Sequence, residues 1–159
     1  MMIKNTAKIF LICLLLVTTN CGFKVLDKLE ENNFTINDIQ TTGDKRVNFK
    51  IKNNLLTYEN KDAQNILLVN FNSKKVKSIK EKNIKNEVTK YQISINIKLE
   101  FSTLNLDEKH QIGISKEGVY LVAESYSSTL SNEKKLIDDL IESISDEIIK
   151  KITLKLDDI

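Results

Sequence analysis

Residues 91–101, YQISINIKLEF, alternate apolar and polar side chains without a break and decide the fold. Successive side chains of a β-strand point to opposite faces, so this alternation gathers every apolar side chain on one face of a sheet. The other face carries glutamine, serine, asparagine, lysine and glutamate. Residues 91–101 therefore predict a strand of an antiparallel sheet with one polar face and one apolar face that must be covered.

The C-terminal stretch can supply this cover, because its apolar residues recur at helical spacing. Leucine or isoleucine returns every four residues from Leu136 to Ile152, and the opposite side is charged. Acidic residues come early and lysines late, as the helix macrodipole favours. Ser131 or Asn132 is expected to cap the start of this segment. We therefore predict a long amphipathic helix packed against the sheet.

Three further segments have the composition of strands. Residues 34–39 are expected to form a first strand that ends at the turn-forming sequence 42–44. A compact apolar run covers residues 66–71, and tyrosine-bearing residues 119–130 form another strand candidate. Together with residues 91–101, these segments predict four strands.

Residues 45–58 fit two patterns. Val47, Phe49 and Ile51 alternate as in a strand, whereas Val47, Ile51 and Leu55 repeat every four residues as in a helix. Asp44 is a plausible N-cap, which favours the helix. The resulting order predicts an α+β fold, with a single four-stranded, mostly antiparallel sheet and two helices packed on one face.

Residues 1–24, MMIKNTAKIFLICLLLVTTNCGFK, have the pattern of a signal peptide. Two lysines precede an apolar run at 9–17, which is too short to cross a hydrocarbon core of about 30 Å. The segment resembles a bacterial lipoprotein signal, in which the cysteine ending a lipobox becomes the acylated first residue, here Cys21. Asn20 departs from the small residue usual at its position, and a secretory signal cut nearby or an uncleaved anchor are the alternatives. The expected organisation is a lipoprotein signal peptide at 1–20, a lipidated tether at 21–33 and an α+β domain at 34–159.

The mature chain is expected to be formally neutral. Two of the 24 basic residues, Lys4 and Lys8, belong to the leader, which leaves 22 to balance the 22 acidic residues. With one arginine and no tryptophan, this balance argues against a nucleic-acid partner. Cys13 would be lost with the leader and Cys21 would become a thioether, so no disulfide is expected.

The sequence contains no recognisable catalytic constellation. His110 is the only histidine, and it lies in the polar stretch 107–110, which is expected to form a turn. A general base there would need a nucleophile and an orienting group, and one histidine with a lipidated cysteine makes no convincing metal site. We therefore predict that the protein is not an enzyme and needs no cofactor besides the covalent lipid on Cys21.

Residues 74–90 stand out by charge, with seven lysines and two glutamates. Apolar Val76, Ile79 and Ile84 lie among the lysines, a pattern typical of contact with an amphipathic anion. Lysine binds phosphate as a point charge. The alternative is a solvated hairpin in a lysine-rich sequence. The candidate anion-contacting residues are Lys74, Lys75, Lys77, Lys80, Lys82 and Lys85.

The chain resembles the LPS-assembly lipoprotein LptE family. The match rests on CGFKVL at 21–26, on a strand opened by KYQI at 90–93, and on a segment bearing Tyr126 that precedes a long amphipathic helix. The resemblance is one of layout and short motifs, and it spans nearly all of the 139 residues that follow the leader.

This resemblance implies a lipid-anchored protein on the periplasmic face of the outer membrane, held in the inner leaflet. Such a protein plugs the β-barrel of LptD and assists lipopolysaccharide assembly at the cell surface. The family fold is a four-stranded sheet backed by two helices, so residues 34–159 would be an LptE-like domain, and the six lysines would contact lipopolysaccharide. Gly22 agrees with sorting to the outer membrane. The alternative is a free-standing periplasmic lipid-binding or envelope-scaffolding lipoprotein, and a lipid carrier would need an enclosed apolar cavity.

Overall fold

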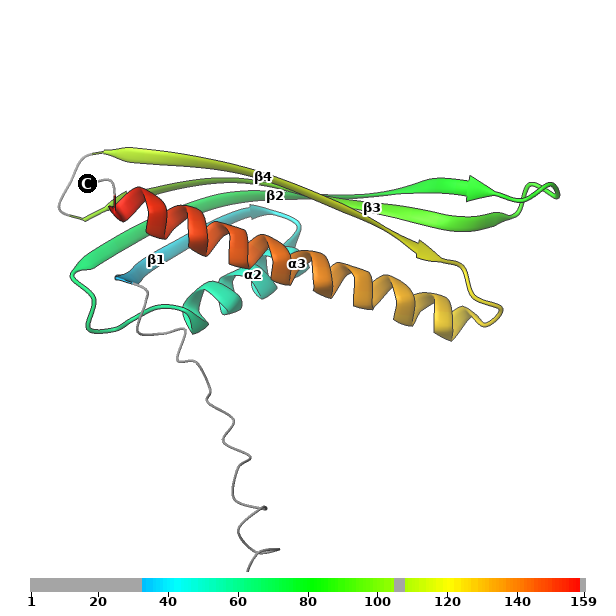
Figure 1. Cartoon of the computed structure of the whole chain (residues 1–159), viewed down its shortest axis with the longest axis horizontal. Coiled ribbons are helices and arrows are strands. Elements are labelled where there is room, and N and C mark those ends of the chain that lie inside the picture. The colour runs from blue at the N-terminus through cyan, green and yellow to red at the C-terminus, as the bar shows by residue number, and fades with distance from the viewer. Residues whose placement is uncertain (1–32, 105–107, 158–159) are drawn as a thin grey trace, which may run out of the picture.

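A computed structural model describes residues 33–104 and 108–157 of the 159-residue chain. The leader, Cys21 and nearly all of the tether lie outside these ranges. No helix within them is both long and apolar enough to span a membrane. The elements, in chain order, are β1 (Phe34–Gly43), α2 (Lys45–Thr57), β2 (Asn65–Lys82), β3 (Val88–Thr103), β4 (Lys109–Leu121) and α3 (Tyr126–Asp157) (Figure 1).

The four strands form one sheet in the order β1-β2-β3-β4. β2 pairs with β3 and β3 with β4 in antiparallel fashion, whereas β1 pairs with β2 in parallel. Both helices lie on the same side of the sheet, and α3 runs along most of its length (Figure 1). The predicted α+β class, with a mostly antiparallel four-stranded sheet and two helices, is confirmed.

The core lies between the sheet and the two helices. The apolar residues of β3 are buried on this side, as their alternation predicts, and the four-residue repeat of α3 is buried against them. Burying one such side chain contributes about 1.5–3 kcal/mol relative to leaving it exposed. The central buried residues are Ile93, Ile95, Ile97, Leu99, Phe101, Leu140, Ile144, Ile148 and Ile152.

The preference for a helix at residues 45–58 is confirmed by α2. The Asp44 carboxylate accepts hydrogen bonds from the backbone N–H groups of Arg46 (3.1 Å) and Val47 (3.0 Å), as an N-cap does. Val47, Ile51 and Leu55 are buried, whereas Phe49 is 65% exposed. The helical repeat therefore describes this segment and the alternation does not.

The prediction of a strand over 119–130 is wrong for most of its length. The fourth strand is β4, which ends at Leu121, and α3 begins at Tyr126. Ser131 and Asn132 therefore lie inside the helix, and the predicted cap at either residue is wrong. The hydroxyl of Ser125 accepts a hydrogen bond from the N–H of Ser128 at 3.0 Å, which stabilises the helix start at this earlier point.

The prediction of a turn around His110 is also wrong, because His110 belongs to β4 and faces Phe101 of β3. The two ring centroids lie 5.0 Å apart. β4 is hard to recognise because Lys116 and Gly118 interrupt its apolar face. Leu136 of α3 occupies the space over Gly118, where a side chain would otherwise lie.

Candidate functional site: a basic hairpin and a polar sheet face

The lysine-rich segment 74–90 is mostly strand. β2 continues to Lys82 and β3 begins at Val88, so the two form a long hairpin that projects beyond β1 (Figure 1). The turn between them is held by Asn83, whose side-chain oxygen accepts hydrogen bonds from the N–H groups of Lys85 (2.9 Å) and Glu87 (3.0 Å). Five of the six candidate lysines therefore lie along strand β2, and Lys85 lies in the turn.

Two of the six candidate lysines are neutralised on the helix side of the sheet. Lys75 forms an ion pair with Asp44 at 3.3 Å, next to the start of α2. Lys77 forms an ion pair with Glu133 of α3 at 2.6 Å. Both lysines thus tie the hairpin to the helices, and neither offers an uncompensated positive charge to a ligand.

Lys77 lies at the centre of a small network. The Glu133 carboxylate also accepts a hydrogen bond from the Tyr120 hydroxyl at 2.7 Å, and the Lys77 ammonium lies 4.4 Å from the centre of the Tyr91 ring. Burial opposes the charged form of Lys77, but its hydrogen bonds to Glu133 and Tyr120 outweigh this and raise its pKa. Burial likewise opposes ionisation of Glu133, and the hydrogen bond from Lys77 lowers its pKa overall. Both groups are therefore charged at neutral pH.

The other four candidate lysines are exposed. Lys82 donates a hydrogen bond to the Asn86 side chain at 2.9 Å, within the hairpin turn. Ile79, which is 53% exposed, and the fully exposed Ile84 lie beside these lysines in sequence. The structure thus separates the predicted set into a paired group and an exposed group with apolar neighbours. The exposed lysines are Lys74, Lys80, Lys82 and Lys85.

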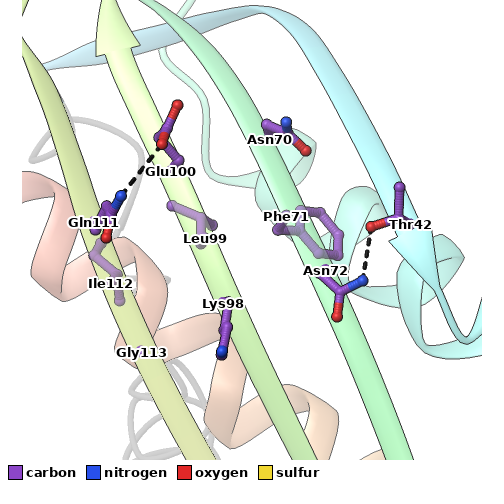
Figure 2. Close-up of a pocket in the computed structure, with 10 residues that line it drawn as sticks. All are labelled: Thr42, Asn70, Phe71, Asn72, Lys98, Leu99, Glu100, Gln111, Ile112 and Gly113. Carbon is purple, nitrogen blue, oxygen red and sulfur yellow. Dashed lines mark hydrogen bonds between the residues drawn. The ribbon is translucent and has the colours of Figure 1, made fainter.

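The sheet face opposite the helices is mostly polar, although Leu68, Val76, Val119 and Leu121 are also exposed on it. Side chains from neighbouring strands hydrogen-bond across it, including Asn72 to Thr42 at 2.8 Å and Ser115 to Asn96 at 2.7 Å. An open hollow of about 590 Å³ lies on the sheet, and Figure 2 shows the residues that line it. Among them, the amide of Gln111 donates a hydrogen bond to the Glu100 carboxylate at 3.4 Å. The residues around the hollow are Thr42, Asn70, Phe71, Asn72, Lys98, Leu99, Glu100, Gln111, Ile112 and Gly113.

The sequence predicts the polar side of 91–101 but not the full extent of this face. The other polar residues of this face come from β1, β2 and β4. In those strands, a polar side chain at every second position is the signal that could have revealed them. Within residues 33–104 and 108–157, no group of three or more histidine, cysteine, aspartate or glutamate side chains is placed to hold a metal ion. What the polar face offers to a surface lying against it is a set of amide, hydroxyl and charged groups.

Known structures share this fold, although no protein-family model and no curated protein matches the sequence. Rare lipoprotein B from Shewanella oneidensis aligns with a TM-score of 0.58 and 11% identity, covering 78% of this chain and 98% of its own. A protein described as a lipoprotein from Caulobacter crescentus CB15 gives a TM-score of 0.52 and 9% identity, covering 74% and 89%. Lipoprotein B from Nitrosomonas europaea gives 0.51 and 10%, covering 86% and 93%. The chain thus has the α+β fold of these bacterial lipoproteins.

Proposed function

We propose that this protein is an envelope lipoprotein of the LptE type, anchored through Cys21 to the periplasmic face of the outer membrane. In this role it fills the lumen of an LptD-like β-barrel and assists lipopolysaccharide assembly at the cell surface. The fold shared with bacterial lipoproteins and the leader ending at Cys21 support the proposal.

The polar outer face of the sheet is the observation that carries the plug role. The inner wall of an outer-membrane barrel is polar, so a protein that fills it needs a rigid polar surface rather than an apolar one. The face bearing Thr42, Asn72, Asn96, Gln111 and Ser115 meets this need. Co-purification of a large outer-membrane β-barrel with the full-length protein is the direct test.

The packing of the core favours this role over that of a lipid carrier. A carrier holds its ligand in an enclosed apolar cavity, whereas here the space between sheet and helices is occupied by closely packed side chains. Phe71, Ile95, Leu99, Ile144 and Ile148 are each at most 2% exposed in that space. A lipid carrier would have to open this core to admit an acyl chain.

The exposed hairpin lysines are proposed to contact the phosphates of lipopolysaccharide. Reversing Lys74, Lys80 and Lys85 to glutamate is expected to weaken binding of purified lipopolysaccharide at least tenfold at low salt. The reason is that three favourable charges become repulsive and are little screened at low ionic strength. The melting temperature should change by less than about 2 °C, because these lysines are exposed and make no ion pair among the described residues.

The matched control reverses Lys61, Lys135 and Lys150, which are exposed elsewhere on the molecule. It changes the net charge by the same amount and should leave the affinity within twofold. Equal losses in both triple variants would mean that net charge alone attracts the ligand. Unchanged affinity in both would identify the hairpin as a solvated surface.

A further inference from the structure

One edge of β2 is left without a partner strand. The pairing of β1 with β2 ends at Gly43 and Ser73, where the chain turns into α2. On its other side, β2 stays paired with β3 as far as Lys82. Between Lys74 and Lys82, the β1 side of β2 therefore has no strand beside it within the described parts of the chain.

The backbone direction identifies which peptide groups face this open edge. The carbonyl of Ser73 accepts a hydrogen bond from the N–H of Asp44 on the β1 side, at 3.2 Å. Since successive residues of a strand direct their N–H and C=O groups to opposite sides, Lys75, Lys77 and Ile79 direct theirs to the same side as Ser73. Such a row of strand groups is a template for another extended segment.

A groove of about 380 Å³ lies beside this edge, on the helix side of the sheet. It is formed between the start of α2 and the first half of α3, and Lys75 of β2 belongs to its wall. An extended segment beside β2 would direct every second side chain towards this groove. The apolar residues that line it are Val47, Leu130, Ile137 and Ile141.

The rim of the groove has an excess of positive charge. The acids near it are already paired: Asp44 with Lys75, and Glu133 with Lys77. Asp138 is paired in the same way with Lys50, another lining residue. This leaves two further lining residues, Arg46 and Lys134, both exposed and both without an acidic partner among the described residues.

We propose that the open edge of β2, with the adjoining groove, binds an extended segment of a partner protein whose groove-facing side chains, at every second position, are apolar and acidic in turn. Main-chain hydrogen bonds to Lys75, Lys77 and Ile79 supply the affinity, and the groove and its cationic rim select the side chains. A second copy of this chain fits poorly, because it would place the same lysine-rich edge against itself. This proposal does not depend on the lipopolysaccharide contact.

The probe is a fluorescent eight-residue peptide, capped at both ends, in which the groove-facing residues are valine and glutamate in turn and the residues between them are threonine. The peptide is titrated against the full-length protein in mild detergent, and its binding is followed by fluorescence anisotropy. Hydrogen exchange measures which backbone amides of the protein become protected. We expect saturable binding and slower exchange of the amide protons of Lys75, Lys77 and Ile79. Methylating the alternate peptide nitrogens that face the edge should weaken binding at least tenfold, because it removes the donors and leaves the side chains in place.

Two protein variants locate the site. Ile79→Pro removes one N–H from the open edge, where proline is tolerated in a strand, and should weaken peptide binding at least fivefold. Lys134→Glu should weaken it three- to tenfold, whereas Lys150→Glu, an exposed position near the other end of α3, should not. No binding by the wild-type protein, or equal binding of the methylated peptide, would overturn the proposal. Protection of the same amides by self-association, without peptide, would assign the edge to a second copy instead.

Discussion

Replacing Gly43 with alanine is expected to lower the free energy of unfolding by about 2–4 kcal/mol. Gly43 has a φ of 98°, a conformation that residues with a side chain rarely adopt. An added Cβ would also overlap the backbone carbonyl of Ser73, which cannot move without disturbing the β1–β2 pairing. Chemical denaturation of the purified protein measures the difference.

The matched control is Gly113→Ala, because a Cβ at that position meets no atom within 4 Å. Its stability should stay within about 0.5 kcal/mol of the wild type. Equal stability of the two variants would contradict the described corner between β1 and α2. In the proposed docking of a partner segment this corner is important, because it ends β1 at Gly43 and so leaves the edge of β2 open.

Replacing Cys21 with alanine is expected to remove the protein from the outer-membrane fraction. One acyl chain holds a protein to a membrane only marginally, and each buried CH₂ adds about 0.8 kcal/mol, so several chains make attachment effectively permanent. Without the thiol no lipid can be attached, and the variant should remain a soluble or inner-membrane precursor. Density-gradient fractionation measures its location, and the mass of the N-terminal peptide reports the lipid.

Cys13→Ala is the control for this experiment, since Cys13 lies in the segment that cleavage would remove. It should fractionate like the wild type and carry the same lipid mass on Cys21. Outer-membrane location of the Cys21→Ala variant would refute lipid anchoring through this residue. It would favour a protein held in the envelope by its partners alone.

The sequence predicts those elements whose apolar residues all face the core, because their burial appears in the sequence as a regular spacing. Residues 91–101 and the four-residue repeat after Leu136 both face the core directly, so their burial follows from periodicity. β4 breaks this rule because α3 approaches it closely. Its apolar face includes Gly118, whose space is filled by Leu136 from another element, and no local pattern contains that information.

The candidate site was predictable in composition but not in arrangement. Excess lysine between residues 74 and 90 is visible in the sequence, as are the alternating polar residues of 91–101. The partner of Lys77, however, lies 56 residues away at Glu133. Which lysines are neutralised is therefore decided by how α3 packs over the hairpin. The open edge of β2 similarly follows from the different lengths of β1 and β2, which only the pairing reveals.

The central claim is that this protein fills a large β-barrel, and affinity capture from membranes tests it most directly. The full-length protein, tagged at its C-terminus, is purified from membranes in a detergent that preserves other barrel complexes, and its partners are identified by mass spectrometry. We expect a large outer-membrane β-barrel in roughly equal molar amount, retained after a high-salt wash. Recovery of the protein alone under these conditions would contradict the plug role and favour a free-standing envelope lipoprotein.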